Sequence, residues 1–172
     1  MQTQRNRVFV SAGEGKSVSL GGVGVNFKID GTQTGGALSV VEHPVDPGRL
    51  VPPHVHHRED EYSFVLEGTI GARIGDEEIT AGPGCYVLKP KDVPHTFWNA
   101  TSEPARIIEM IAPAGFERFF QELGDLAVAM SDDFPRFAEA RTELGRRYEL
   151  DFVAAEWIPE LKEKYGLKLL GE

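Results

Sequence analysis

The chain has 172 residues, 41% of them hydrophobic, and a formal net charge of −9. This length suits one domain over residues 1–172, and the composition is ordinary for a globular protein. The acidic excess argues against a nucleic-acid partner, because binding phosphates requires a basic surface. The apolar runs are too short to cross a membrane, and the N-terminus lacks the apolar core of a signal peptide. We therefore expect a cytoplasmic protein without a membrane partner.

Short strands separated by glycine and proline turns fill the first two thirds of the chain. Alternating apolar and polar residues between Val18 and Ile29 predict a half-buried strand interrupted at Gly21 and Gly22, and the stretch Gly31–Gly36 reads as a flexible loop. Further strands are expected at 7–10, 38–43, 62–66, 69–74, 77–80, 86–88 and 105–111. So many short strands without intervening helices favour an all-β, antiparallel sandwich or small barrel over about residues 7–112.

The pattern changes to a helical one after Pro113. Apolar residues recur at helical spacing over 116–126, and further helices are expected over 135–148 and 153–165, the last disturbed by Pro159. We expect this segment, about 113–166, to cover an outer face or a mouth of the barrel. Phe116, Phe119 and Phe120 then either pack in the core or form the lid of an apolar pocket.

Two histidines at alternate positions are the first sign of chemistry. His54 and His56 share one face if the segment is an extended strand, so both imidazoles can reach one metal ion. The carboxylates of Glu59, Asp60 and Glu61 follow directly. Two histidines and one carboxylate leave coordination positions open, as in a working metal site rather than a closed structural one.

A second stretch, 84–99, supplies a further candidate ligand. It reads as a strand, a proline turn and the start of another strand, and His95 directly follows Pro94. We expect the folding of the chain to bring His95 to the first pair of histidines.

The two stretches together resemble the two motifs of the cupin superfamily. The positions that match the first motif are Gly48, His54, His56, Glu61 and Gly68, and those that match the second are Gly84, Pro90, His95 and Asn99. One position departs from the family pattern, because Asp92 stands where the family usually has glycine. The resemblance implies a jelly-roll barrel in which His54, His56, Glu61 and His95 hold one divalent first-row metal ion, such as iron, manganese, nickel, cobalt or zinc.

The residues by themselves leave the choice of carboxylate open. In a straight strand Asp60, and not Glu61, would share the face of His54, so Glu61 needs a bulge or turn among residues 57–60. The resemblance selects Glu61. His57 points away from His56 in a regular strand and is expected outside the ligand set, whereas His43 lacks a partner at ligand spacing and is expected to be structural.

Four further side chains are expected to face inward near the ligands. Ser63 and Val65 share the face of Glu61, and Phe97 and Asn99 share that of His95. Plain packing and substrate contact are equally good explanations for these four. No cluster of arginine or lysine converges on them, so we expect a substrate that is neither phosphorylated nor strongly anionic.

The run 52–61, Pro-Pro-His-Val-His-His-Arg-Glu-Asp-Glu, resembles that of small single-domain cupins similar to quercetin 2,3-dioxygenase. This resemblance implies a metal-dependent dioxygenase acting on a flavonol-like or other enolisable small molecule, with Glu61 as the catalytic base. Two alternatives are a metal-holding binding or sensing module without turnover, and a metal-dependent isomerase or hydrolase. Small cupins commonly pair through their sheets, so a homodimer through the N-terminal strands is expected.

Overall fold

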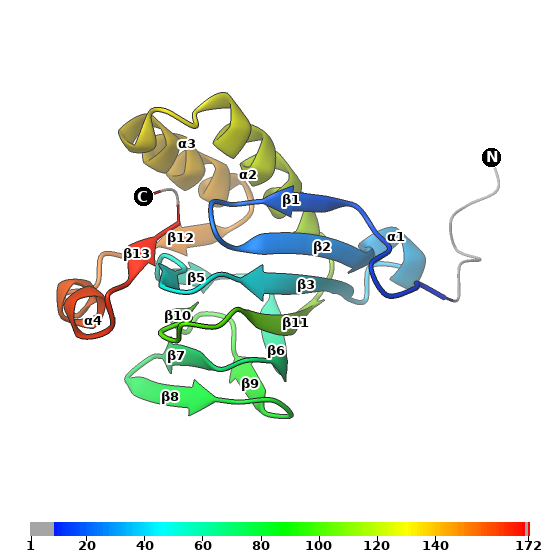
Figure 1. Ribbon diagram of the computed structural model, residues 1–172. Coiled ribbons are helices and arrows are strands. Elements are labelled where there is room, and N and C mark those ends of the chain that lie inside the picture. Colours follow the sequence, from blue (N-terminus) through cyan, green and yellow to red (C-terminus); the bar gives the residue numbers. More distant parts are fainter. Residues whose placement is uncertain (1–8, 171) are drawn as a thin grey trace.

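The computed structural model describes residues 9–170 and 172, which form strands in two facing sheets and four helices (Figure 1). The strands are β1 (Ser17–Ser19), β2 (Gly24–Ile29), β3 (Ser39–Val45), β4 (Arg49–Leu50), β5 (His54–His56), β6 (Asp60–Glu67), β7 (Ile70–Ile74), β8 (Glu77–Ala81), β9 (Tyr86–Lys89), β10 (His95–Trp98), β11 (Ala105–Ala112), β12 (Leu150–Phe152) and β13 (Lys168–Leu169). The helices are α1 (Gly31–Thr34), α2 (Glu117–Ala129), α3 (Phe134–Arg147) and α4 (Ile158–Tyr165).

Almost every strand pair is antiparallel. One sheet has the order β1-β2-β3-β11-β6-β9, and the other has the order β12-β5-β10-β4-β13, with β7 also paired to β10 and β8 to β7. Neighbours such as β3 and β11 lie far apart in the sequence, so the strands cross between the sheets as in a jelly roll. The predicted all-β, antiparallel jelly-roll barrel with a C-terminal helical segment is confirmed.

The core lies between the two sheets because strict alternation gives each central strand one apolar face. Buried and partly exposed residues alternate along β3, β6 and β11. Val41, Val65, Ile107 and Ile111 lose all contact with solvent. Burying each such side chain stabilises the fold by about 1.5–3 kcal/mol, which is why the register of these strands is strongly specified.

The N-terminal region differs from the expectation in three respects. The segment from Val18 to Ile29 is not one interrupted strand but the hairpin of β1 and β2, because both Gly21 and Gly22 adopt positive φ angles. The expected flexible loop contains the short helix α1, which the side chain of Asp30 caps. The strand expected at 7–10 is absent at residues 9 and 10, and residues 7 and 8 lie outside the described part of the chain.

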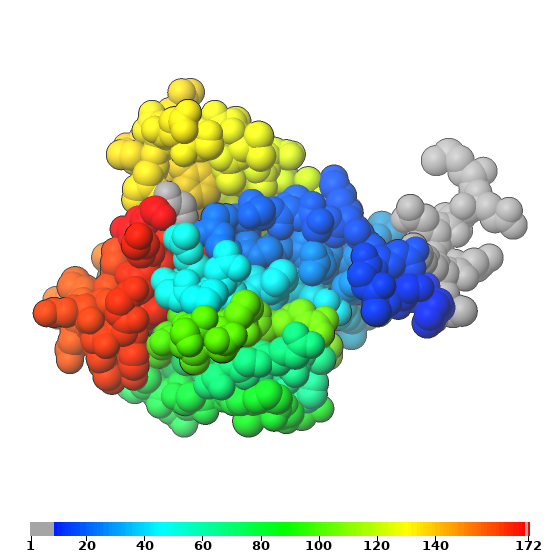
Figure 2. Space-filling model, viewed as in Figure 1, coloured from blue at the N-terminus to red at the C-terminus, as the bar shows by residue number. Residues whose placement is uncertain are grey.

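Helices α2 and α3 lie side by side over β1 and β2 at the upper end of the barrel in Figure 1, and Figure 2 shows their yellow surface as a lobe above the N-terminal strands. The third helix is shorter than expected, because α4 begins only at Ile158, with Pro159 in its first turn where the missing N–H costs nothing. None of the helices in the described residues combines the length and the apolar character that crossing a membrane requires.

The C-terminal segment also completes the second sheet, which the sequence pattern did not indicate. Strand β12 pairs antiparallel with β5, so that Phe152 lies opposite His54. Strand β13 pairs parallel with β4. The helical segment is therefore anchored on both sides of the strands that carry the histidines.

The close approach of β7 to β10 generates a prediction about stability. Gly71 pairs with Trp98, and a Cβ atom at Gly71 would overlap the buried indole ring. We expect Gly71→Ala to lower the free energy of unfolding by about 1–3 kcal/mol through overpacking, measured by urea denaturation. A Cβ at Gly82 meets no atom within 4 Å, so Gly82→Ala is the matched control and is expected to stay within about 0.5 kcal/mol of the wild type. Equal stability of the two variants would contradict this packing.

Candidate metal centre

The pairing of β5 with β10 brings the two histidine motifs together. His95 lies directly opposite His54 in the antiparallel register, and their ring centroids are 4.5 Å apart. His54 and His56 lie on the short strand β5, and all three imidazoles are buried. The expected convergence of His95 on the first pair is confirmed.

Glu61 completes the group, and the chain break that it requires is present. Strand β5 ends at His56 and β6 begins at Asp60, so the segment between them turns the chain before Glu61. The neighbouring carboxylates lie elsewhere: Asp60 accepts a hydrogen bond from the backbone N–H of Lys91, and Glu59 lies behind His56. Of the three carboxylates in the run, Glu61 is the one that the structure brings among the imidazoles.

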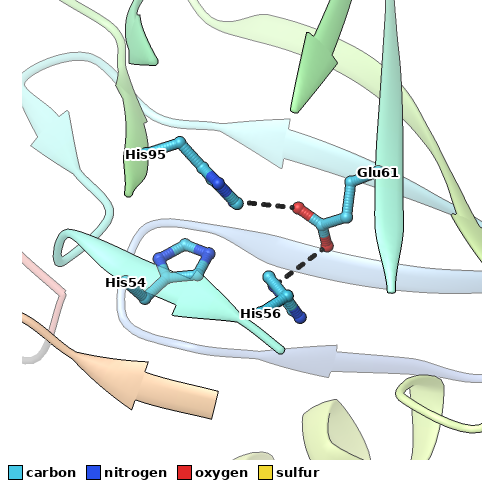
Figure 3. A group of neighbouring side chains, drawn as sticks. All are labelled: His54, His56, Glu61 and His95. Atoms are coloured by element: carbon cyan, nitrogen blue, oxygen red, sulfur yellow. Dashed lines mark ion pairs between the residues drawn. The ribbon is translucent and has the colours of Figure 1, made fainter. Parts of the chain in front are cut away.

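The four side chains point toward a common centre (Figure 3). One candidate ligand atom from each of His54, His56, Glu61 and His95 lies within 4.8 Å of all the others. The Nε2 atoms of His56 and His95 lie 3.4 and 3.3 Å from the two carboxylate oxygens of Glu61. Three imidazole nitrogens and one carboxylate oxygen form a donor set that suits several first-row metal ions.

Backbone carbonyls fix the orientation of two of the rings. Nδ1 of His54 donates to the carbonyl of Pro52 at 2.7 Å, and Nδ1 of His95 donates to the carbonyl of Val93 at 3.0 Å. Each bond leaves Nε2 as the unprotonated atom that faces the centre. Behind His56, a carboxylate oxygen of Glu59 lies 3.5 Å from Nδ1, an arrangement that supports metal-binding histidines in other proteins.

The buried polar atoms that lack partners fit a metal ion at this centre. In the described part of the chain, both ring nitrogens of His56 and Nε2 of His95 are buried without a hydrogen bond. Buried polar atoms are nearly always satisfied, because an unmet one costs about 1–3 kcal/mol. A cation at the common centre would satisfy the Nε2 atoms of both rings.

A buried ion-pair network adjoins Glu61. Nζ of Lys89 lies 2.9 Å from Glu61 and 2.6 Å from Glu109, and Ser63 donates to the carboxylate of Glu109. Sequence reasoning missed Lys89 and Glu109, although a signal was present. Lys89 shares the inward face of β9 with Val87. Glu109 lies between Ile107 and Ile111 on the buried face of β11.

The charges of this network depend on burial and on neighbouring ions. Burial by itself raises the pKa of Glu61, but the Lys89 ammonium and the nearby imidazoles outweigh it, so the pKa lies well below its ordinary value. Burial and the other two histidines hold the pKa of His54 well below its usual range, and burial lowers that of His95. At neutral pH Glu61 is therefore ionised while both imidazoles are neutral, as metal ligands must be. Burial raises the pKa of Glu109 to about 7.

A mostly apolar cavity of about 60 Å³ opens onto the centre. The side chains of His54, His56 and Glu61 form part of its wall, and Phe116, Phe119 and Phe120 of the helical segment form another part. The ring of Phe116 packs 4.3 Å from that of His56, centroid to centroid. Phe116 and Phe119 are therefore part of the core, as the first alternative expected, and together with Phe120 they also line the cavity.

The residues expected to face the cavity divide into two groups. Phe97 lines the cavity. Val65 is part of the core, and the hydroxyl of Ser63 donates a hydrogen bond to the carboxylate of Glu109. Asn99 is buried, but its amide donates to the carbonyls of Val45 and Glu103 and holds a turn.

The expectation of no cluster of arginine or lysine near these residues overlooked two cations of the cavity. Lys89 and Arg141 both line it. Arg141 follows Phe137 by four residues and precedes Leu144 by three, so it lies on the apolar face of α3. A charged residue at a helix position where the pattern predicts an apolar one was the sequence signal that Arg141 faces inward.

Two other histidines lie outside the ligand group, as expected. His43 is buried, its Nδ1 donates to the carbonyl of Gly24 at 2.9 Å, and its ring also lines the cavity. His57 is partly exposed and pairs with Asp92 and Asp151. Asp92 has a φ of 63°, so it adopts the left-handed conformation that explains glycine at this motif position, and aspartate tolerates this conformation better than most residues.

Comparison with known proteins agrees with this fold and this site. The Cupin domain family matches residues 42–111, which include all four candidate ligands. The chain is 26% identical over 100 residues to polyketide synthase CurC from Streptomyces cyaneus, a match that covers 58% of this chain and 65% of CurC. The chain thus spans less than two thirds of that relative.

Solved structures show the same fold at low sequence identity. KdgF from Halomonas sp. superposes with a TM-score of 0.59 at 18% identity, covering 66% of this chain and 99% of KdgF. An RmlC-like cupin from Shewanella frigidimarina gives a TM-score of 0.57 at 19% identity, covering 69% of this chain and 99% of its own. The Cupin domain match covers residues 42–111, about two fifths of the chain, and includes the three-histidine and one-glutamate cluster, while these solved structures share the barrel fold.

Proposed function

We propose that this protein is a metal-dependent cupin enzyme of the dioxygenase type that acts on a small enolisable molecule. One observation carries the proposal: unpaired imidazole nitrogens of His56 and His95 meet a carboxylate at the wall of an apolar cavity. A ligand in the cavity would lie against His54, His56 and Glu61, which all face it. Since Glu61 also contacts His95, one centre would serve both metal and substrate.

His54, His56, Glu61 and His95 would hold the ion, and a divalent first-row metal there would supply Lewis acidity and an electron route to dioxygen. Glu61 would accept the proton of the substrate's enol or hydroxyl group, since it is ionised and reaches the cavity. Lys89, 2.9 Å from Glu61, holds this carboxylate in place. The aromatic wall around Phe116 would exclude water from the resulting enolate.

Two observations bear on the substrate. The similarity to a protein named as a polyketide synthase supports an enolisable substrate, because polyketide chains carry alternating carbonyl groups. The cavity of about 60 Å³ is smaller than the engineered cavity of about 150 Å³ that binds benzene. A short 1,3-dicarbonyl compound therefore fits more readily than a flavonol, for which side chains of the wall would have to move.

A binding or sensing module without turnover is the second candidate, and the state of Glu61 favours it. A carboxylate whose pKa lies well below its ordinary value is a weak base. If Lys89 keeps Glu61 in this state with ligand present, the centre would hold a molecule without taking its proton. Consumption of oxygen in the presence of an enolisable compound separates the two candidates.

Metal binding is tested by elemental analysis of the purified protein and of single variants. We expect about one first-row metal ion per chain in the wild type, and at least a tenfold loss in His54→Ala and in His95→Ala, because each removes a ligand. His57→Ala is the control, since His57 lies outside the cluster and is partly exposed. Equal metal content in all four proteins, or none in the wild type after reconstitution, would contradict the metal centre.

The role of Glu61 is tested by Glu61→Gln. The amide keeps the size of the side chain and can still donate an oxygen to the metal, but it cannot accept the proton. We expect part of the metal to remain and the rate of oxygen uptake with 1,3-diketones and flavonols to fall by about 10²–10⁴-fold.

The matched control is Asp60→Asn, which neutralises the adjacent carboxylate outside the cluster and is expected to keep most of the activity. If Glu61→Gln takes up oxygen at the wild-type rate, Glu61 is not the base. Tight binding of these compounds without oxygen uptake, with every metal tried, would favour the binding module.

A further inference from the structure

Arg141 is a half-buried cation that neither the fold nor the metal centre explains. It lies on α3 and lines the cavity on the side of the helical segment. Its guanidinium lies between two aromatic rings, with Cζ 4.7 Å from the centroid of Phe152 and 5.9 Å from that of Phe137. These contacts hold the side chain in position but use none of its N–H groups as donors to oxygen.

The guanidinium lacks a counter-ion within the described part of the chain. Its Nε and Nη1 atoms are buried without a hydrogen-bond partner, and no carboxylate of the described residues contributes to the shift of its pKa. Burial lowers the pKa of Arg141 to about 10, so it stays charged at neutral pH. A buried charge without a partner is costly, and an anion in the cavity would remove that cost.

Lys89 is the other cation of the cavity wall, and it differs in this respect. Its ammonium lies 2.6 Å from Glu109 and 2.9 Å from Glu61, so its charge is balanced by the protein itself. Arg141 is thus the uncompensated cation among the described residues that line the cavity. An anionic group entering there would meet a planar donor fork suited to two oxygen atoms.

A single aromatic ring separates Arg141 from the metal centre. The ring of Phe152 that contacts the guanidinium has its centroid 6.2 Å from that of His54. Phe152 is held there by the pairing of β12 with β5, directly opposite His54. A molecule lying along this ring would reach Arg141 with one end and His54 with the other.

We propose that Arg141 binds the carboxylate of the cavity ligand, so that the substrate is a small enolisable carboxylic acid whose carbonyl end faces His54 and Glu61. This proposal reverses the expectation, drawn from the sequence, of a substrate without strong negative charge. The substrate class depends on the proposed function, whereas anion binding by Arg141 does not.

The experiment compares, by ligand-observed NMR, the binding of propionate with that of its neutral isostere propionamide, because both are smaller than benzene and suit the small cavity. Both are titrated against the full chain as purified and again after metal removal with a chelator. The proteins are the wild type, Arg141→Met, Arg141→Lys and the control Arg136→Met, which removes the same charge from an exposed position of the same helix. Arg141→Met keeps an apolar stem against Phe152, and thermal unfolding verifies that each variant is folded.

We expect the wild type and Arg136→Met to bind propionate at least about tenfold more tightly than propionamide, with and without metal. Arg141→Met should bind the two probes equally, and Arg141→Lys should keep part of the preference. Equal binding of the two probes to the wild type, no detectable binding, or a preference that survives in Arg141→Met would each overturn the proposal. If the preference for propionate persists without metal and no oxygen uptake is found, anion binding by Arg141 is upheld and the proposed enzyme activity is refuted.

Discussion

The antiparallel pairing of β5 with β10 is the contact on which the rest of the site depends. It sets His95 directly opposite His54, and it joins two segments that are about forty residues apart in the chain. Strand β10 is in turn held by β7, through the close approach of Gly71 to Trp98. Because β5 is also paired with β12, and β10 with β7, the barrel itself holds the backbones that carry the imidazoles, which is the usual requirement for a precise site.

The interior of the barrel also contains a network of buried charged side chains. Glu61, Lys89 and Glu109 lie in one line of contacts between the sheets, all of them buried. Their mutual attraction offsets the cost of removing them from water only because the geometry is tight and Ser63 adds further hydrogen bonds. The network thereby keeps Glu61 ionised next to the histidines, where it can serve either as a ligand or as a weak base.

The helical segment turns an open barrel mouth into an enclosed site. Helix α2 contributes the aromatic wall next to His56, and α3 contributes Arg141. Strand β12 ties this segment to β5 through the pair of Phe152 and His54. The barrel thus supplies the candidate metal ligands, while the C-terminal residues set the size of the cavity and its one unbalanced charge among the described lining residues.

Local patterns in the sequence were sufficient for the barrel, for helices α2 and α3, and for the three candidate histidines. Period-two alternation and glycine turns are read from neighbouring residues, whereas the choice of Glu61 over Glu59 and Asp60 rested on the resemblance to the cupin motifs. The hairpin of β1 and β2 was mistaken for one strand because the alternation continues across its turn.

Only the tertiary structure decided which other side chains meet at the site. Lys89, Glu109 and Arg141 come from three separate elements, and nothing in their local sequence says which charged residue on an inward face finds a partner. The pairing of β12 and β13 with the barrel also depends on contacts distant in sequence. Whether a buried charge is balanced, as in Lys89, or left open, as in Arg141, is a property of the assembled interior rather than of any segment, because it depends on every group that packs around it.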